Sequence, residues 1–159
     1  MVRAFLCFCT ALAQSAEPTE SAAEIAARAS QAMEAKDYVR AEALTRTAVR
    51  MDPEFAEGWV ALGLSLWWQE RQAEAQAAFE EALGAHSRRF EKDPTDSNQL
   101  LQQVFVLVLL GREQDALTQL RSAKARFPKQ ASLDISEDQV SKWRQLLDEE
   151  LGAHPIAES

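Results

Sequence analysis

Cysteine, histidine, glycine and proline are all scarce in this chain of 159 residues. It contains two cysteines, two histidines, five glycines and five prolines. Few glycines and prolines mean few interruptions of regular structure, and the abundant Ala, Glu, Gln, Leu and Arg are good helix formers. Both cysteines, Cys7 and Cys9, lie near the N-terminus. The composition therefore favours helices and excludes a disulfide framework in the body of the chain.

Sequence strings that mark catalytic, nucleotide or metal sites are also missing. HExxH, CxxC, P-loop, GxSxG and GxGxxG patterns do not occur. His86 and His154 are far apart, and adjacent acids such as Glu80 and Glu81 point in different directions on a helix. We therefore expect no enzyme and neither a cofactor nor a metal; a small-ligand carrier or an enzyme is kept as an alternative.

The net charge of the chain is −8. An acidic surface repels the phosphates of nucleic acids and anionic lipids, so we expect neither as the main partner. Apolar residues make up 47% and charged residues 26% of the chain, which are ordinary values for a globular protein. A chain of this length can bury a core as one domain.

The first 13 residues differ from the rest. Met1-Val2-Arg3 gives a short positive start, residues 4–13 are apolar or small, and Ala11-Leu12-Ala13 is a small-x-small site. This is the layout of a secretory signal peptide cleaved after Ala13. About ten apolar residues cannot span a bilayer, which needs roughly 20. We predict a signal peptide at 1–13, a linker at 14–21 and an exported, periplasmic or secreted protein without stable membrane insertion. The alternative is an apolar helix that packs on a cytoplasmic domain.

The rest of the chain has an internal period of 34 residues. This interval separates four pairs of like residues: Ala41 and Ala75, Ala48 and Ala82, Ile25 and Trp59, Pro94 and Pro128. With Trp59-x-x-Leu62-Gly63, Ala75, Phe79 and Ala82, the period resembles the tetratricopeptide repeat (TPR) family. The resemblance implies an all-α fold in which three helix–turn–helix repeats, at 22–55, 56–89 and 97–130, form a right-handed superhelical stack. A capping helix at 131–152 and a flexible tail at 153–159 follow.

Helix-start signals and periodicity predict helices at 21–35, 38–51, 53–69, 72–91, 94–110, 113–126 and 136–151. Ser21-x-x-Glu24 has the form of a capping box. Asp52-Pro53 and Asp93-Pro94 are read as an N-cap followed by the first helical residue. Seven additional residues between Ala82 and Pro94 predict that the helix at 72–91 is about two turns longer than its equivalents. Its end, 86–92, is locally basic: either a contact for an acidic partner or a solvated helix end.

In the TPR family the first helix of each repeat lines a concave groove. The resemblance places eight large apolar residues there: Met33, Val60, Leu64, Trp67, Trp68, Leu101, Phe105 and Val108. An apolar groove implies a non-catalytic scaffold or adaptor that binds an apolar or amphipathic segment of another protein. Two alternatives stay open. The same strip could mediate self-association in an envelope complex, giving a homo-oligomer, or it could be core that the stack covers.

Overall fold

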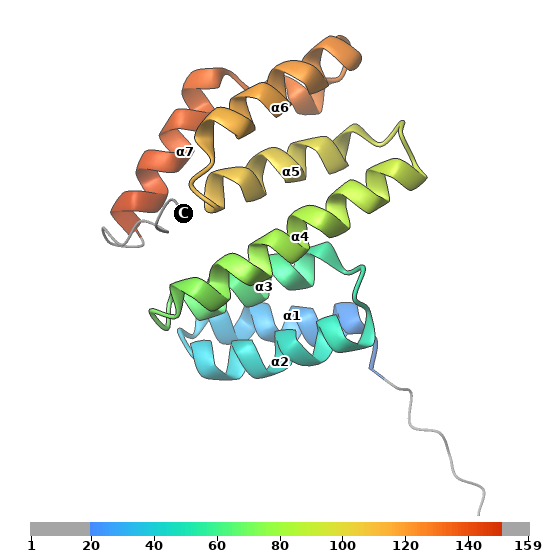
Figure 1. The fold of residues 1–159 in the computed structure, drawn as a ribbon. Helices are drawn as coiled ribbons and strands as arrows, with labels where there is room; N and C mark the ends of the chain where they lie inside the picture. The colour runs from blue at the N-terminus through green and yellow to red at the C-terminus, as the bar shows by residue number, and fades with distance from the viewer. Residues whose placement is uncertain (1–19, 151–159) are drawn as a thin grey trace, which may run out of the picture.

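The computed structural model describes residues 20–150, which form helices joined by short turns (Figure 1). The described part contains no strand. The elements are α1 (Ala22–Glu34), α2 (Tyr38–Met51), α3 (Ala56–Trp67), α4 (Gln72–Lys92), α5 (Ser97–Leu109), α6 (Glu113–Arg126), the 3-10 helix η1 (Ala131–Leu133) and α7 (Glu137–Glu150). All seven predicted helices are present, with ends within three residues of the prediction. The predicted signal peptide at 1–13, nearly all of the linker at 14–21 and the tail at 153–159 lie outside the described residues.

The helices form a stack in chain order. Each helix packs against the next one, and α1 also contacts α3 while α5 contacts α7. Figure 1 shows the successive pairs α1–α2, α3–α4 and α5–α6, with α7 beside the last pair. The predicted all-α stack of helix–turn–helix units with a C-terminal helix is therefore confirmed. Within residues 20–150, every helix is too short or too polar to cross a membrane.

The turn inside each helix pair has the same backbone conformation in all three units. Lys36, Glu70 and Gly111 have positive φ angles of 57°, 60° and 76°. In each case the next residue donates its backbone N–H to the carbonyl five residues earlier, over 2.8, 3.1 and 2.9 Å. This bond pattern is the Schellman ending of a helix. The three turns recur at intervals of 34 and 41 residues, so the repeat seen in the sequence is a repeat of structure.

The connections between helix pairs correct one prediction. Asp52 and Asp93 are not N-caps: each is the C-cap of the preceding helix, and α3 and α5 begin four residues later. Their carboxylates accept the backbone N–H of Glu54 and Thr95, at 3.0 and 3.1 Å. An Asp that bonds the backbone two residues ahead forms a turn, and the proline that follows suits the turn better than the helix. The capping box at Ser21 is confirmed.

The seven additional residues lie in α4. This helix has 21 residues, whereas α2 and α6 have 14 each. The predicted lengthening by two turns is therefore confirmed. Because α4 continues to Lys92, the predicted repeat boundary at residue 89 falls inside the helix.

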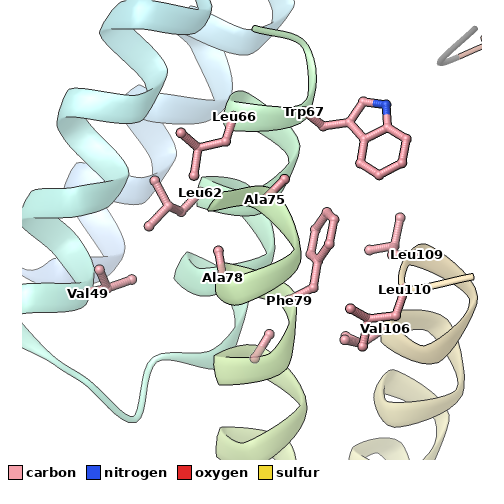
Figure 2. Packing of buried hydrophobic residues seen from close by; sticks show 11 residues of the cluster. Val49, Leu62, Leu66, Trp67, Ala75, Ala78, Phe79, Val106, Leu109 and Leu110 are labelled. Atoms are coloured by element: carbon pink, nitrogen blue, oxygen red, sulfur yellow. The ribbon is translucent and has the colours of Figure 1, made fainter. Parts of the chain in front are cut away.

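Small residues lie where helices cross, and large ones fill the spaces between. Gly63, Ala75 and Ala82 are all buried, and a side chain at Gly63 would collide with the ring of Phe79. Phe79 belongs to a cluster to which α3, α4 and α5 all contribute; Figure 2 shows Trp67 and Leu109 beside its ring. Close crossings of this kind require residues without bulky side chains.

A second cluster joins α5, α6 and α7. Val104, Leu120 and Val140 are each 0% exposed within it. Val140 belongs to α7, which thus covers the apolar surface that the third helix pair would otherwise present to water. The stack ends in a helix that closes its core, as a repeat array requires.

Candidate protein-binding surface

Three of the eight predicted groove residues reach the surface above one core cluster. Val60 and Leu64 on α3 and Phe105 on α5 are partly buried and pack against the cluster around Phe79. Leu147 on α7 packs against the same cluster. These four residues are called the apolar strip below. They come from three helices that the fold brings to one core.

Leu101 and Met33 lie outside the apolar strip. Leu101 is partly buried against a smaller cluster formed by Leu100, Ala123 and Leu133. Met33 is partly buried near the end of α1. The predicted residues therefore do not form one continuous row.

Trp67 and Val108 belong to the core. Trp67 is 7% exposed and lies 6.5 Å from the ring of Phe79, between ring centroids. Val108 is 0% exposed within the cluster that α7 closes. Neither side chain is open to a partner in this conformation, so for these two residues the structure corrects the prediction of a groove surface.

Trp68 has a different role. It is 37% exposed and stacks on Tyr38, with ring centroids 5.6 Å apart and planes 10° from parallel. Tyr38 is the first residue of α2 and Trp68 is the C-cap of α3, so the stacked pair joins the turn of the first unit to that of the second. Stacked aromatic rings stabilise such a junction beyond the area that they bury.

Sequence reasoning missed the contribution of α7 to this surface. Trp143 meets Phe105 edge to face at 6.4 Å, and Leu147 completes the apolar strip. The signal was present, since Trp143-x-x-Leu146-Leu147 repeats the spacing of Trp59-x-x-Leu62-Gly63. The sequence alone predicts a capping helix here, but it does not predict that this helix contributes to the apolar strip.

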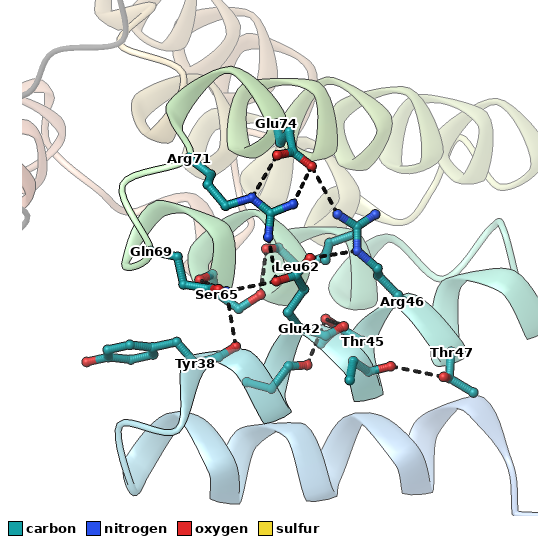
Figure 3. A network of polar contacts seen from close by, with 12 residues as sticks. Tyr38, Glu42, Thr45, Arg46, Thr47, Leu62, Ser65, Gln69, Arg71 and Glu74 are labelled. Atoms are coloured by element: carbon teal, nitrogen blue, oxygen red, sulfur yellow. Dashed lines mark hydrogen bonds and ion pairs between the residues drawn. The ribbon is translucent and has the colours of Figure 1, made fainter.

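A polar network joins α2 of the first unit to the α3–α4 turn and the start of α4 in the second (Figure 3). Glu42 on α2 accepts hydrogen bonds from Arg46 at 2.8 Å, from Arg71 at 2.7 Å and from Gln69 at 2.9 Å. Glu74 binds the other side of both guanidinium groups. Burial raises the pKa of Glu42, but the three donors outweigh it and the pKa is lowered. A carboxylate held in its charged form in this way fastens helices and is unsuited to proton transfer.

His86 lies between α4 and α5 and is 0% exposed. Its Nδ1 is 2.9 Å from Oε1 of Gln99, whose amide group donates to Asp96 at 2.9 Å. Because the Gln99 oxygen faces the ring, Nδ1 must carry the proton, and Nε2 is left buried without a hydrogen-bond partner. Burial lowers the pKa of His86, and the hydrogen bond that the ring donates to Gln99 opposes this shift.

The basic end of α4 pairs with the start of the same unit. Arg88 contacts Glu54 at 2.8 Å, and Arg89 contacts Glu57 at 2.8 Å. Lys92 lies 3.8 Å from Glu54. Of the two readings left open for residues 86–92, these contacts favour the solvated helix end, because Arg88 and Lys92 stay exposed while pairing with acids of their own unit. His86 is buried and is not part of that exposed end. The last two turns of α4 form ion pairs with Glu54, just before α3, and with Glu57 in its first turn.

No protein-family model and no curated protein matches this chain. Among solved structures, a chain of the "CopN-Scc3 complex" is similar, with a TM-score of 0.47 and 19% sequence identity. The match covers 77% of this chain and 68% of that chain. A likeness of this size does not establish a shared function.

Proposed function

We propose that the chain is a non-catalytic scaffold of the tetratricopeptide type that binds an apolar or amphipathic segment of a partner protein across α3, α5 and α7. The observation that carries the proposal is the apolar strip. Val60, Leu64, Phe105 and Leu147 come from three helices and remain partly exposed above one core cluster. Gathered apolar side chains of this kind are typical of interaction surfaces.

The contribution of the apolar strip to the binding free energy can be estimated from single side chains. An aromatic or aliphatic anchor at the centre of an interface contributes about 2 kcal/mol or more to binding. Phe105 is held by Trp143 in a fixed edge-to-face contact, so little side-chain entropy is lost when a partner covers it. A helix with apolar residues on one face is a form of partner that such an apolar surface can bind.

Introducing a negative charge into the strip tests the proposal. We expect Leu64→Glu and Phe105→Glu to lower the capture of partners from source-cell extract by roughly tenfold or more, measured by quantitative mass spectrometry. Val39→Glu is the matched control, because Val39 is 68% exposed on α2 and outside the strip. Circular dichroism checks that each variant is folded. Capture by Leu64→Glu and Phe105→Glu equal to that of the control would refute the proposal.

Self-association is the second candidate. It is favoured by Leu146, which is 54% exposed on α7, the helix that ends the stack. Light scattering over a concentration series distinguishes the two functions. A scaffold for another protein stays monomeric alone, whereas a self-associating module gains mass as the concentration rises and loses the gain in Leu146→Glu.

Export is part of the proposal. The N-terminal pattern predicts that the mature chain begins at Gln14 and acts in the periplasm or outside the cell. Fractionation followed by mass measurement of the intact protein tests it: an exported form lacking residues 1–13 supports it, and a cytoplasmic form that keeps them contradicts it.

A further inference from the structure

Positive charge is concentrated in one segment of this acidic chain. Residues 116–133 contain Arg121, Lys124, Arg126 and Lys129 and no acidic residue. The rest of the chain therefore carries −12, the difference between the net charge of −8 and the +4 of this segment. The segment spans most of α6, the turn after it and η1.

Three of these four cations are not paired with a carboxylate in the described part of the chain. Arg121 contacts Glu137 at 2.6 Å. Lys124, Arg126 and Lys129 have no such contact within residues 20–150. The basic end of α4 differs in this respect, because Arg88 and Arg89 are each bound to a glutamate.

Arg126 lines one hollow, together with Phe90 and Leu100. Lys124 and Lys129 line another hollow, whose wall is partly apolar. Its wall includes Lys124, Phe127, Pro128, Lys129, Leu133 and Asp134. Phe127 and Leu133 belong to the small core cluster at this end of the molecule, so the wall is fixed by the fold. Asp134 subtracts one charge from the local balance.

Arg126 is held in place before any ligand arrives. Its guanidinium lies 4.8 Å from the ring centroid of Phe90 and 5.5 Å from that of Phe127. It also donates to the carbonyl of Pro94 at 3.3 Å. Contacts with aromatic faces restrict the side chain and leave other N–H groups free to bind a carboxylate in a bidentate way. Less conformational entropy is then lost on binding.

We propose that this surface, defined by Lys124, Arg126, Phe127 and Lys129, binds a short acidic segment of a partner protein, separately from the apolar strip. Charge complementarity selects the ligand, since Lys124, Arg126 and Lys129 each line a hollow and none of them forms an ion pair within residues 20–150. A short segment matches the patch, whereas a nucleic acid or an anionic membrane would extend beyond it against a chain that carries −12. Screening at physiological salt limits the attraction to about 8 Å, which also favours a local contact.

The test uses a short fluorescein-labelled peptide rich in glutamate, with fluorescence anisotropy as the readout. The variant is Lys124→Gln, Arg126→Gln and Lys129→Gln combined. Its matched control is Lys36→Gln, Arg40→Gln and Arg50→Gln combined, because these three exposed cations also lack ion pairs within residues 20–150. Both triple variants make the same change in net charge.

We expect the first triple variant to weaken peptide binding by about tenfold, and the control by less than about twofold. Lys129→Gln alone changes one exposed side chain and keeps the test informative if the triple variant does not fold; it should weaken binding by about twofold. Equal losses in both triple variants, or no peptide binding by the unmodified protein, would overturn the proposal. Tighter binding to duplex DNA or to phosphatidylserine vesicles than to the peptide would overturn it too.

Discussion

Gly63 lies where α3 crosses α4, and the ring of Phe79 occupies the space that a side chain there would need. We expect Gly63→Ala to lower the free energy of unfolding by roughly 1–3 kcal/mol, because the ring can move only by disturbing the core around it. Gly84→Ala is the control: a new Cβ there would meet only the flexible end of Arg88, at 3.1 Å. Alanine in a helix is favoured over glycine by about 0.5–1 kcal/mol, so this variant should be more stable. Urea unfolding measures both, and equal effects would contradict the crossing geometry.

His86 should make stability depend on pH. Burial lowers its folded pKa below the ordinary value of 6.5, with the Glu57 carboxylate favouring the charged ring and the Arg89 guanidinium opposing it. Below pH 6.5 the unfolded chain therefore binds the proton more readily, and stability falls with pH from 6.5 down to the folded pKa. Carboxylates such as Glu42 lose their contribution at lower pH, below about 4.5.

The measurement is urea unfolding at several pH values between about 7 and 5. In His86→Gln the free energy of unfolding should change little with pH in this window, whatever its value at neutral pH. An unchanged pH dependence in the variant would show that His86 is not the group responsible.

Single residues mark the limit of what the sequence predicts. The period of 34 places Ala41, Ala75 and Ala82 at crossings, and all three are 0% exposed. The resemblance to the TPR family places Val108 in an open groove, but Val140 of α7 packs into the same cluster and closes it. Helical position defines the face on which a residue lies. Whether another helix covers that face depends on contacts distant in sequence.

The turns inside the helix pairs allow a direct test of the repeat. Glu70 has a φ of 60°, a left-handed conformation that costs a side-chain-bearing residue roughly 1 kcal/mol and costs glycine little. Glu70→Gly should therefore raise the free energy of unfolding by up to about 1 kcal/mol, and Gly111→Ala, at a φ of 76°, should lower it by a similar amount. Thermal unfolding followed by circular dichroism reports both. Changes of the same sign would contradict the equivalence of the two turns.

Some helix ends are determined by residues close in sequence, and others depend on packing between side chains. Ser21 and Glu24 form their capping box through bonds within four residues, and the sequence predicts it correctly. Asp52-Pro53 is consistent both with a helix start and with a turn that ends a helix. The choice between them depends on Phe55, whose ring lies against Gly58 and leaves α3 to begin at Ala56. The length of α4 follows from the number of residues between Ala82 and Pro94, and the sequence therefore predicts it correctly.

The stack should unfold as one unit. Leu147 packs against both large core clusters, and so does Leu83 of α4, so neither half can open without disturbing the other. Tryptophan fluorescence and far-ultraviolet circular dichroism should therefore give coincident urea transitions. Repeat arrays with weak interfaces unfold in separate stages, and two resolved transitions would show that the interface between α4 and α5 is of that kind.

Binding along the apolar strip is the central claim, and hydrogen–deuterium exchange of the protein with and without its captured partner tests it most directly. We predict slower exchange of the backbone amides in α3 and α5, around Val60, Leu64 and Phe105, with smaller changes in α1 and α2. Protection that leaves α3 and α5 unchanged while slowing exchange elsewhere would contradict the claim.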